Sequence, residues 1–300
     1  MNKKLKFKIL FFTLLIIIIS VFTIFTIANE SYVSLDSNYI ISEVAPLNVF
    51  QAGPKMTGFT ENFDRDSLIE ENWPIKRSGD NNWWVSSGAY LYVRDGVGET
   101  IQGNLNISDK WVNKFYLANA KDTANGYRPQ NIFRLVYKKK ASDYTQSVYS
   151  RINYYDESES ENRNASNGIL LFNRYQDEFS LYYAGVRVDG NLVIKKKLNG
   201  VYYTLALKQI FEGEYDRFNN PNLIPIDTWI GIKTVVQTVE KNKVKISLYT
   251  DIGRTGIWTL ALEVVDNGDL FDKVITKPGY GGIRTDFMDA SFDDFVFKSM

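Results

Sequence analysis

Short runs of apolar and aromatic residues, separated by turn signals, recur along the chain from Phe59 to the C-terminus. Asp189-Gly190, Asn199-Gly200 and Asn267-Gly268 stand between such runs, and these dipeptides are strong hairpin signals. No stretch shows a sustained helical period. We therefore expect an all-β, two-sheet antiparallel sandwich without helices. The expected strands are 83–85, 89–93, 132–137, 147–155, 168–174, 180–188, 191–198, 201–207, 229–236, 244–249, 258–265 and 290–297.

Residues 182–188 show the alternation most clearly. Tyr182, Ala184, Val186 and Val188 form one apolar face, and Tyr183 and Arg187 lie on the opposite face. Successive side chains of a strand point to opposite sides of a sheet. The pattern predicts that Tyr182 faces the core and that Tyr183 and Arg187 face away from it.

The N-terminal segment has a different pattern. Residues 9–28 form an uncharged apolar run, preceded by four lysines within the first eight residues. A helix of this length spans ~30 Å, the thickness of a bilayer core, and the lysines favour the cytoplasmic side. We expect a single-pass signal anchor with the C-terminal domain outside the cell; cleavage after Ala28 would instead release a secreted protein. Residues 1–28 are thus a transmembrane segment, 29–56 a polar stalk and 57–300 the folded domain.

The composition excludes several kinds of chemistry. The chain contains neither Cys nor His, so disulfides, thiolate catalysis, imidazole catalysis and His-ligated zinc are absent. The 35 basic residues include the four N-terminal lysines, and the remaining 31 stand against 35 acidic ones, a net charge of −4 beyond residue 28. This balance does not favour nucleic acid as a partner.

Three motifs resemble concanavalin A-like jelly-roll domains, the superfamily of laminin G-like and family 16 glucanase-like domains. The first is Phe59-Thr60-Glu61-Asn62-Phe63-Asp64 followed by Trp83-Trp84-Val85, and the second is Asn167–Asp177 with Tyr182–Arg187. The third is Gly281-Gly282-Ile283-Arg284-Thr285-Asp286 leading into Ala290–Val296. The resemblance covers about residues 57–300 and implies a jelly roll. That fold hosts lectins, glycosidases, lyases and structural modules, so it does not define an activity.

The resemblance also directs attention to acidic residues. Glucanase relatives carry alternating carboxylates on one strand as nucleophile and general acid. Glu157, Glu159 and Glu161 have this spacing, but serines separate them and a polar, Asn-rich stretch follows. This composition favours a solvated loop over a catalytic strand.

Six residues form the candidate ligand surface. They occupy alternating positions of three successive expected strands and would line one polar sheet face: Tyr149, Arg151, Tyr183, Arg187, Lys195 and Lys197. The pattern fits ordinary solvent-facing residues, a sugar-binding surface, or a lyase site in which a cation neutralises a uronate and a tyrosine acts as base. Lys196, on the opposite face, is also charged, which suggests an edge strand.

Asp293 in the last strand and Glu61 in the first are candidate ligands of a structural calcium ion, because these strands are neighbours in the resembled family and calcium prefers oxygen ligands. Hairpin-end acids without a metal are the alternative.

These observations favour a membrane-anchored extracytoplasmic carbohydrate-binding or adhesion module, with an acidic glycan or cell-envelope polysaccharide as partner. A polysaccharide-degrading enzyme, lyase before hydrolase, and a structural envelope protein are the alternatives. A groove that holds a tyrosine beside Arg or Lys would favour the lyase, whereas a flat face would not.

Overall fold

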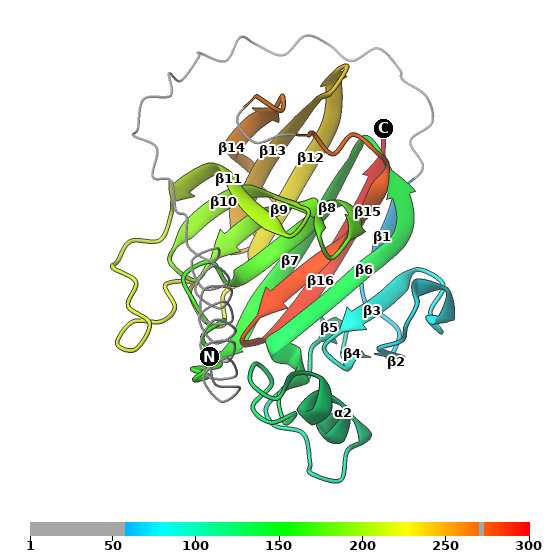
Figure 1. Cartoon of the computed structure of the whole chain (residues 1–300), viewed down its shortest axis with the longest axis vertical. Helices are drawn as coiled ribbons and strands as arrows, with labels where there is room; N and C mark the ends of the chain where they lie inside the picture. Colours follow the sequence, from blue (N-terminus) through cyan, green and yellow to red (C-terminus); the bar gives the residue numbers. More distant parts are fainter. Residues whose placement is uncertain (1–57, 270–272) are drawn as a thin grey trace, which may run out of the picture. The chain divides into compact units, whose positions relative to one another are not determined.

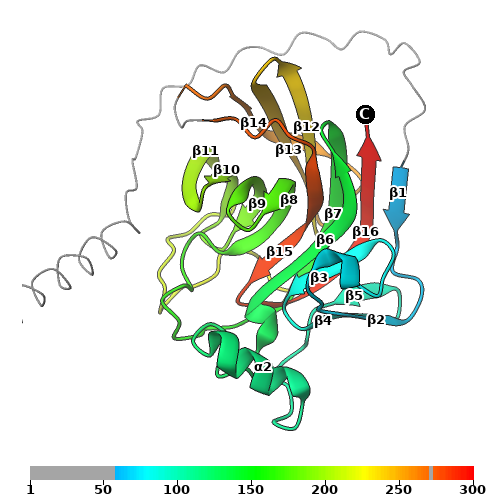
Figure 2. The ribbon, with the colours of Figure 1, turned by 45° about the vertical axis from the view of Figure 1, so that its right-hand side comes forward.

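The computed structural model describes residues 58–269 and 273–300. In this part of the chain two antiparallel sheets pack face to face, as Figures 1 and 2 show. The expected two-sheet antiparallel sandwich is thereby confirmed, and its topology is consistent with a jelly roll. The predicted transmembrane segment 9–28 and the stalk lie outside the described residues. No helix within the described ranges is long and apolar enough to cross a membrane.

Sheet A contains nine strands. In spatial order, eight of them are β14 (Thr259–Asp266), β13 (Lys243–Ile252), β12 (Ile230–Glu240), β7 (Tyr144–Tyr155), β16 (Met288–Ser299), β5 (Val97–Glu99), β4 (Tyr90–Arg94) and β2 (Ser67–Glu70). The ninth, β1 (Gly58–Glu61), also pairs with β16.

Sheet B contains seven strands. In spatial order they are β11 (Val201–Gln209), β10 (Asn191–Leu198), β9 (Ser180–Arg187), β8 (Gly168–Asp177), β15 (Gly279–Asp286), β6 (Ile132–Ala141) and β3 (Trp83–Ser87). The chain crosses from sheet A to sheet B between β7 and β8, through residues 156–167.

The main hydrophobic core lies between the sheets and follows the expected alternation. Tyr182, Ala184, Val186 and Val188 belong to this core, whereas Tyr183 belongs to a separate cluster on the other side of sheet B. The core residues of β16, such as Phe292, are equally inaccessible to solvent. Period-2 patterning therefore fixes which face of each strand is buried.

Lys196 differs from the expectation. Strand β10 lies between β9 and β11 and is not an edge, and the Lys196 side chain is fully buried. Its ammonium pairs with Asp266 at 3.0 Å, and Asp266 also accepts a hydrogen bond from the Tyr182 hydroxyl at 2.6 Å. This lysine enters the core because a carboxylate meets it there.

One α-helix, α2 (Lys110–Asn119), was not expected from the sequence. Asp109 caps its N-terminus by accepting a hydrogen bond from the Trp111 amide at 2.8 Å. Trp111, Val112 and Phe115 are buried, and Trp111 and Phe115 pack in a small cluster with Ile101. With ten residues and three buried side chains, the helix is too short to show a sustained period. Two 3-10 turns, Ile75–Arg77 and Pro129–Asn131, complete the secondary structure of the described residues.

Candidate functional site

The outer face of sheet B is unusually apolar for a surface that points away from the core. Eight side chains from β3, β6, β8, β9 and β10 form a cluster there, each no more than 7% exposed: Trp84, Val136, Leu170, Phe172, Tyr175, Leu181, Tyr183 and Val193. An ordinary solvent-facing sheet carries mainly polar residues on this side. The face is therefore built differently from a plain outer surface.

Contacts between distant strands show that this face is concave. Tyr202 on β11 and Arg284 on β15 are four strand positions apart, about 19 Å on a flat sheet at ~4.8 Å per strand. Even so, Arg284 lies over the Tyr183 ring, 5.1 Å from guanidinium carbon to ring centroid, and its charge lowers the pKa of Tyr202. Side chains converge in this way only if the sheet curves around them. We call this surface the concave face.

Both ends of the concave face are bordered by other segments. Residues 156–167 border one end, where the Arg187 Nε donates to the Ala165 carbonyl at 3.1 Å and the Lys195 Nζ to that of Ser166 at 3.5 Å. At the other end Trp73 packs on Trp84 at 5.4 Å between centroids, and Ile75 packs against the apolar cluster. These segments border the concave face at its two ends, and we refer to the surface between them as the groove.

Two arginines stand side by side at the centre of the groove. Arg284 on β15 and Arg134 on β6 are directly opposed cross-strand partners. Like charges in this arrangement destabilise a sheet. Arg284 is compensated by Asp286, whose two carboxylate oxygens both lie 2.9 Å from its Nε. Within the described residues, no ion pair includes Arg134. The charge of Arg134 is therefore not compensated by a carboxylate in this part of the chain.

Tyrosines and lysines continue the groove across β9, β10 and β11. The rings of Tyr183 and Tyr202 stack with centroids 6.1 Å apart. The Lys195 ammonium lies 5.5 Å and 5.4 Å from these two centroids, and that of Lys197 lies 4.7 Å from the centroid of Tyr202. The described part of the chain has no ion pair for either lysine. The groove thus combines flat rings with unpaired cations.

The surroundings of Lys195, Tyr202 and Tyr183 shift the pKa of each side chain. Burial lowers the pKa of Lys195 to about 8, and the neighbouring Arg284 contributes to the shift. Burial alone would raise the pKa of Tyr202, but the charges of Arg284 and Lys197 and their hydrogen bonds outweigh it and lower that pKa to about 8. Tyr183 behaves oppositely, because burial raises its pKa to about 12.

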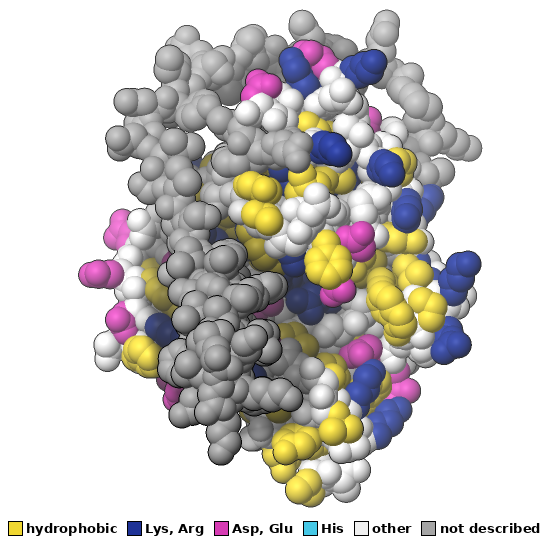
Figure 3. Space-filling model, viewed as in Figure 1, with side chains coloured by type: hydrophobic (Ala, Val, Ile, Leu, Met, Phe, Trp, Pro, Cys, Tyr) yellow, Lys and Arg dark blue, Asp and Glu magenta, His cyan; other side chains and the backbone are white. Residues whose placement is uncertain are grey.

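Figure 3 shows the surface of the protein from the viewpoint of Figure 1. Lys and Arg atoms gather near the middle of the face, over β15, with apolar side chains around them (Figure 3). Acidic side chains lie directly beside these cations.

The structure brings together only part of the predicted ligand surface. Tyr183, Lys195 and Lys197 do share the concave face. Arg187 lies on the same strand as Tyr183, but it pairs with Asp189 at 2.5 Å and holds residues 156–167, so its charge is compensated.

Tyr149 and Arg151 correct the prediction that all six residues line one face. Both lie on β7 in sheet A, because the chain crosses the core between β7 and β8. The Tyr149 hydroxyl donates to Asp251 at 2.7 Å, and the Arg151 guanidinium lies 5.0 Å from the Trp229 ring centroid. The outer faces of the two sheets point in opposite directions. These two residues therefore cannot contact a ligand in the concave face.

Three residues of the groove were missed as site residues: Arg134, Arg284 and Tyr202. A signal for Tyr202 was present, because a two-residue Asn199-Gly200 hairpin sets Lys197 opposite Tyr202, as observed. No local signal places Arg134 and Arg284 together, since their strands pair over 150 residues of separation.

The remaining candidates do not form a catalytic or metal cluster in the described residues. Glu157, Glu159 and Glu161 lie in the loop after β7, as expected. Asp293 pairs with Arg254 at 2.6 Å, whereas Glu61 accepts hydrogen bonds from the Phe63 amide and the Trp83 indole. Among the residues described, no group of three or more acidic side chains is placed to hold a metal ion. The structural calcium ion stays a prediction.

No protein-family model matches this sequence, and no curated protein matches it. Similar solved structures include the carbohydrate binding module CBM66 from Bacillus subtilis, at 14% identity and TM-score 0.45, covering 74% of this chain and 98% of that one. The Bacillus licheniformis beta-glucanase has 9% identity and TM-score 0.43, with 82% and 100% covered. For the xylan beta-1,4-xylosidase of Bacillus halodurans the values are 11% and 0.43, with 85% of this chain but only 41% of that enzyme covered.

At such TM-scores we take no activity from these neighbours. The class that the fold and site define is a two-sheet β-sandwich with a concave, aromatic and cationic outer face.

Proposed function

We propose that the chain binds acidic polysaccharide in the concave face of sheet B. The observation that carries the proposal is the set of three cations that have no ion-pair partner among the described residues, Arg134, Lys195 and Lys197, on a face that also holds Tyr183 and Tyr202. Guanidinium groups match carboxylate or sulfate oxygens in a planar fork, and lysines add point charge. Tyr202 is 48% exposed and supplies flat apolar surface for a sugar ring, whereas Tyr183 is only 3% exposed and packs beneath it.

The charge of the groove contrasts with that of the chain. Beyond residue 28 the net charge is −4, so a local excess of cations is not a reflection of general composition. A cross-strand arginine pair costs stability, and a bound anion between the two guanidinium groups would offset this cost. Neutral glycans would gain only the ring contacts.

The test is a titration of the full-length chain, purified in a detergent that carries no sugar, with polygalacturonate and with a neutral β-glucan. Polygalacturonate should bind more tightly, and its affinity should fall as salt rises, because exposed charges are screened over ~10 Å at 0.1 M. Equal affinity for both polymers, or affinity that does not change with salt, would show the proposal to be wrong.

Lyase activity is a second candidate, favoured by the lowered pKa of Tyr202 beside Arg284 and Lys197. In this reaction the Tyr202 phenolate would take the proton at C5 of a uronate whose carboxylate the cations neutralise. The electron pair would form the C4–C5 double bond, the C4–O bond would break, and the leaving sugar oxygen would gain a proton.

Only a lyase changes the polysaccharide, so the reaction product distinguishes the two candidate functions. A lyase releases an unsaturated sugar that absorbs ultraviolet light, and Tyr202→Phe should abolish this product while polygalacturonate still binds. If the unmodified chain forms no unsaturated product from polyuronates, the lyase candidate fails and the binding proposal stands.

We further propose that residues 9–28 direct the domain to the outside of the cell, where the domain either stays attached through this single-pass anchor or, after cleavage behind Ala28, is secreted. The support is the apolar run and the lysines before it. The intact chain should fractionate with membranes and be accessible to protease added outside whole cells. A chain protected from that protease in intact cells would contradict the proposal.

A further inference from the structure

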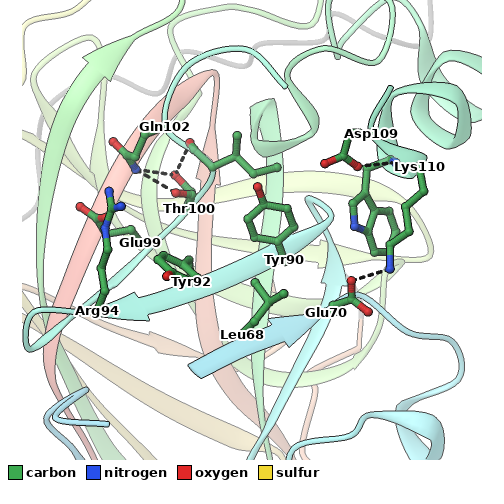
Figure 4. Close-up of a pocket in the computed structure, with 12 residues that line it drawn as sticks. Leu68, Glu70, Tyr90, Tyr92, Arg94, Glu99, Thr100, Gln102, Asp109 and Lys110 are labelled. Atoms are coloured by element: carbon green, nitrogen blue, oxygen red, sulfur yellow. Dashed lines mark hydrogen bonds and ion pairs between the residues drawn. The ribbon is translucent and has the colours of Figure 1, made fainter. Parts of the chain in front are cut away.

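A second hollow lies away from the concave face, where strands β2, β4 and β5 of sheet A meet the start of helix α2 (Figure 4). Its volume is about 690 Å³, within the ~300–1,000 Å³ typical of small-molecule sites. All its lining residues lie within 68–111, a part of the chain from which the sequence predicted no site.

The floor of the hollow consists of two tyrosines on one strand. Leu91 and Val93 of β4 point into the core, so Tyr90 and Tyr92 both point outward. Tyr92 is 39% exposed and is the cross-strand partner of both Leu68 and Glu99. The Arg94 guanidinium carbon lies 5.3 Å from the centroid of the Tyr92 ring and covers part of it, and the part that stays exposed faces the bordered hollow.

Polar groups stand on both sides of this floor. Figure 4 shows Arg94, Glu99 and Gln102 on one side, and Glu70, Asp109 and Lys110 on the other. Arg94 pairs with Glu99 at 3.0 Å, and Lys110 pairs with Glu70 at 2.5 Å. Each side thus presents donors beside acceptors.

The charges of the hollow differ in kind from those of the concave face. Three carboxylates stand against two cations, and each carboxylate is already engaged, two in ion pairs and Asp109 as the cap of α2. An anionic ligand would meet a slight negative excess without a free cation. Sugar hydroxyls both donate and accept hydrogen bonds, so they fit paired donors and acceptors without a net charge.

We propose that this hollow is a second glycan site, specific for an uncharged oligosaccharide. A neutral sugar ring stacks on Tyr92, and its hydroxyls contact the Arg94–Glu99 pair on one side and the Glu70–Lys110 pair on the other. The proposal stands on the hollow alone and does not depend on the concave face.

The experiment uses the full-length chain in sugar-free detergent and an array of neutral glucan, xylan, mannan and fructan oligosaccharides, with polygalacturonate in parallel. At least one neutral oligosaccharide should bind, and Tyr92→Ala should weaken it tenfold or more. Glu99→Gln should also weaken it, because it replaces an acceptor with an amide and breaks the pair with Arg94.

Two controls separate this site from the other. Tyr116→Ala removes an exposed tyrosine of α2 that does not line the hollow, and it should leave neutral binding unchanged. Arg284→Gln should affect polygalacturonate and leave the neutral oligosaccharide unaffected. The inference is overturned if no neutral oligosaccharide binds at millimolar concentration, or if the one that binds does so equally well to Tyr92→Ala. Loss of polygalacturonate binding alone would count against the concave face only.

Discussion

Three consecutive lysines on β10 illustrate how much the surroundings of a residue decide. Lys195 and Lys197 point into the concave face without an ion-pair partner among the described residues, and Lys196 enters the core, where it pairs with Asp266. Their charge alone, as seen in the sequence, does not distinguish the three lysines from one another. The face on which each side chain lies distinguishes them: Lys195 and Lys197 belong to the concave face, and Lys196 forms a buried ion pair with Asp266 of sheet A.

The two groups with a pKa of about 8 give a testable pH dependence. A bound polyanion favours the charged form of Lys195 and the neutral form of Tyr202, because the phenolate would repel it. As pH rises through about 8, Lys195 loses its charge and Tyr202 becomes negative. We predict that the affinity for polygalacturonate, measured by calorimetry, falls about tenfold between pH 7 and pH 9.

The matched control is Lys195→Met combined with Tyr202→Phe. Neither replacement titrates, so this variant should bind polygalacturonate with an affinity that hardly changes over the same range. If its affinity falls as steeply as that of the unmodified chain, other groups cause the pH dependence and our assignment to this pair is wrong.

Individual strands illustrate what local sequence signals can and cannot define. Period-2 patterning correctly separates Tyr183 from Tyr182, and the Asn-Gly hairpin sets Lys197 opposite Tyr202. Patterning does not say which sheet a strand joins, so Tyr149 on β7 was placed beside Tyr183 although a core separates their sheets. Arg284 meets Arg134 only through non-local pairing, which no short motif encodes.

The hairpin between β10 and β11 is the element on which part of the groove depends. Asn199 and Gly200 both have positive φ, 51° and 88°, as a two-residue turn of this kind requires. Gly200→Ala meets only an ordinary contact in space, with Phe179 at 3.7 Å, so its cost is conformational. We expect ~1–2 kcal/mol of lost stability, a fall in Tm of a few degrees, and weaker polygalacturonate binding as Tyr202 shifts.

Gly79→Ala is the control for this substitution. Gly79 has no heavy atom within 4 Å of a built Cβ and does not adopt a positive φ. It should change neither Tm nor binding by more than a small fraction of the effect at Gly200. Equal effects at both positions would mean that the left-handed conformation is not what makes Gly200 important.

At the scale of the whole molecule, the two sheets present different outer surfaces. Sheet B carries the concave face, whose Arg134, Lys195 and Lys197 have no ion-pair partner in the part of the chain that the structure describes. Near Tyr149, sheet A carries cations that are engaged locally, for example Arg254, which pairs with Asp293 and Asp294 and lies 5.2 Å from the Tyr149 ring centroid. We therefore assign the binding of acidic glycan to the outer face of sheet B.

The most direct test of this claim compares one arginine from each side. Arg284→Gln and Arg151→Gln each remove one positive charge, and polygalacturonate affinity is measured for both at low salt. Circular dichroism and melting curves confirm that the folds are intact, and Arg134→Gln serves as a second groove variant because its loss leaves no acidic partner unpaired. We predict that Arg284→Gln and Arg134→Gln weaken binding by about 10–100-fold, the value of a charge-assisted hydrogen bond, and that Arg151→Gln binds as tightly as the unmodified chain. Equal loss in Arg151→Gln, or full affinity in both groove variants, would contradict the account.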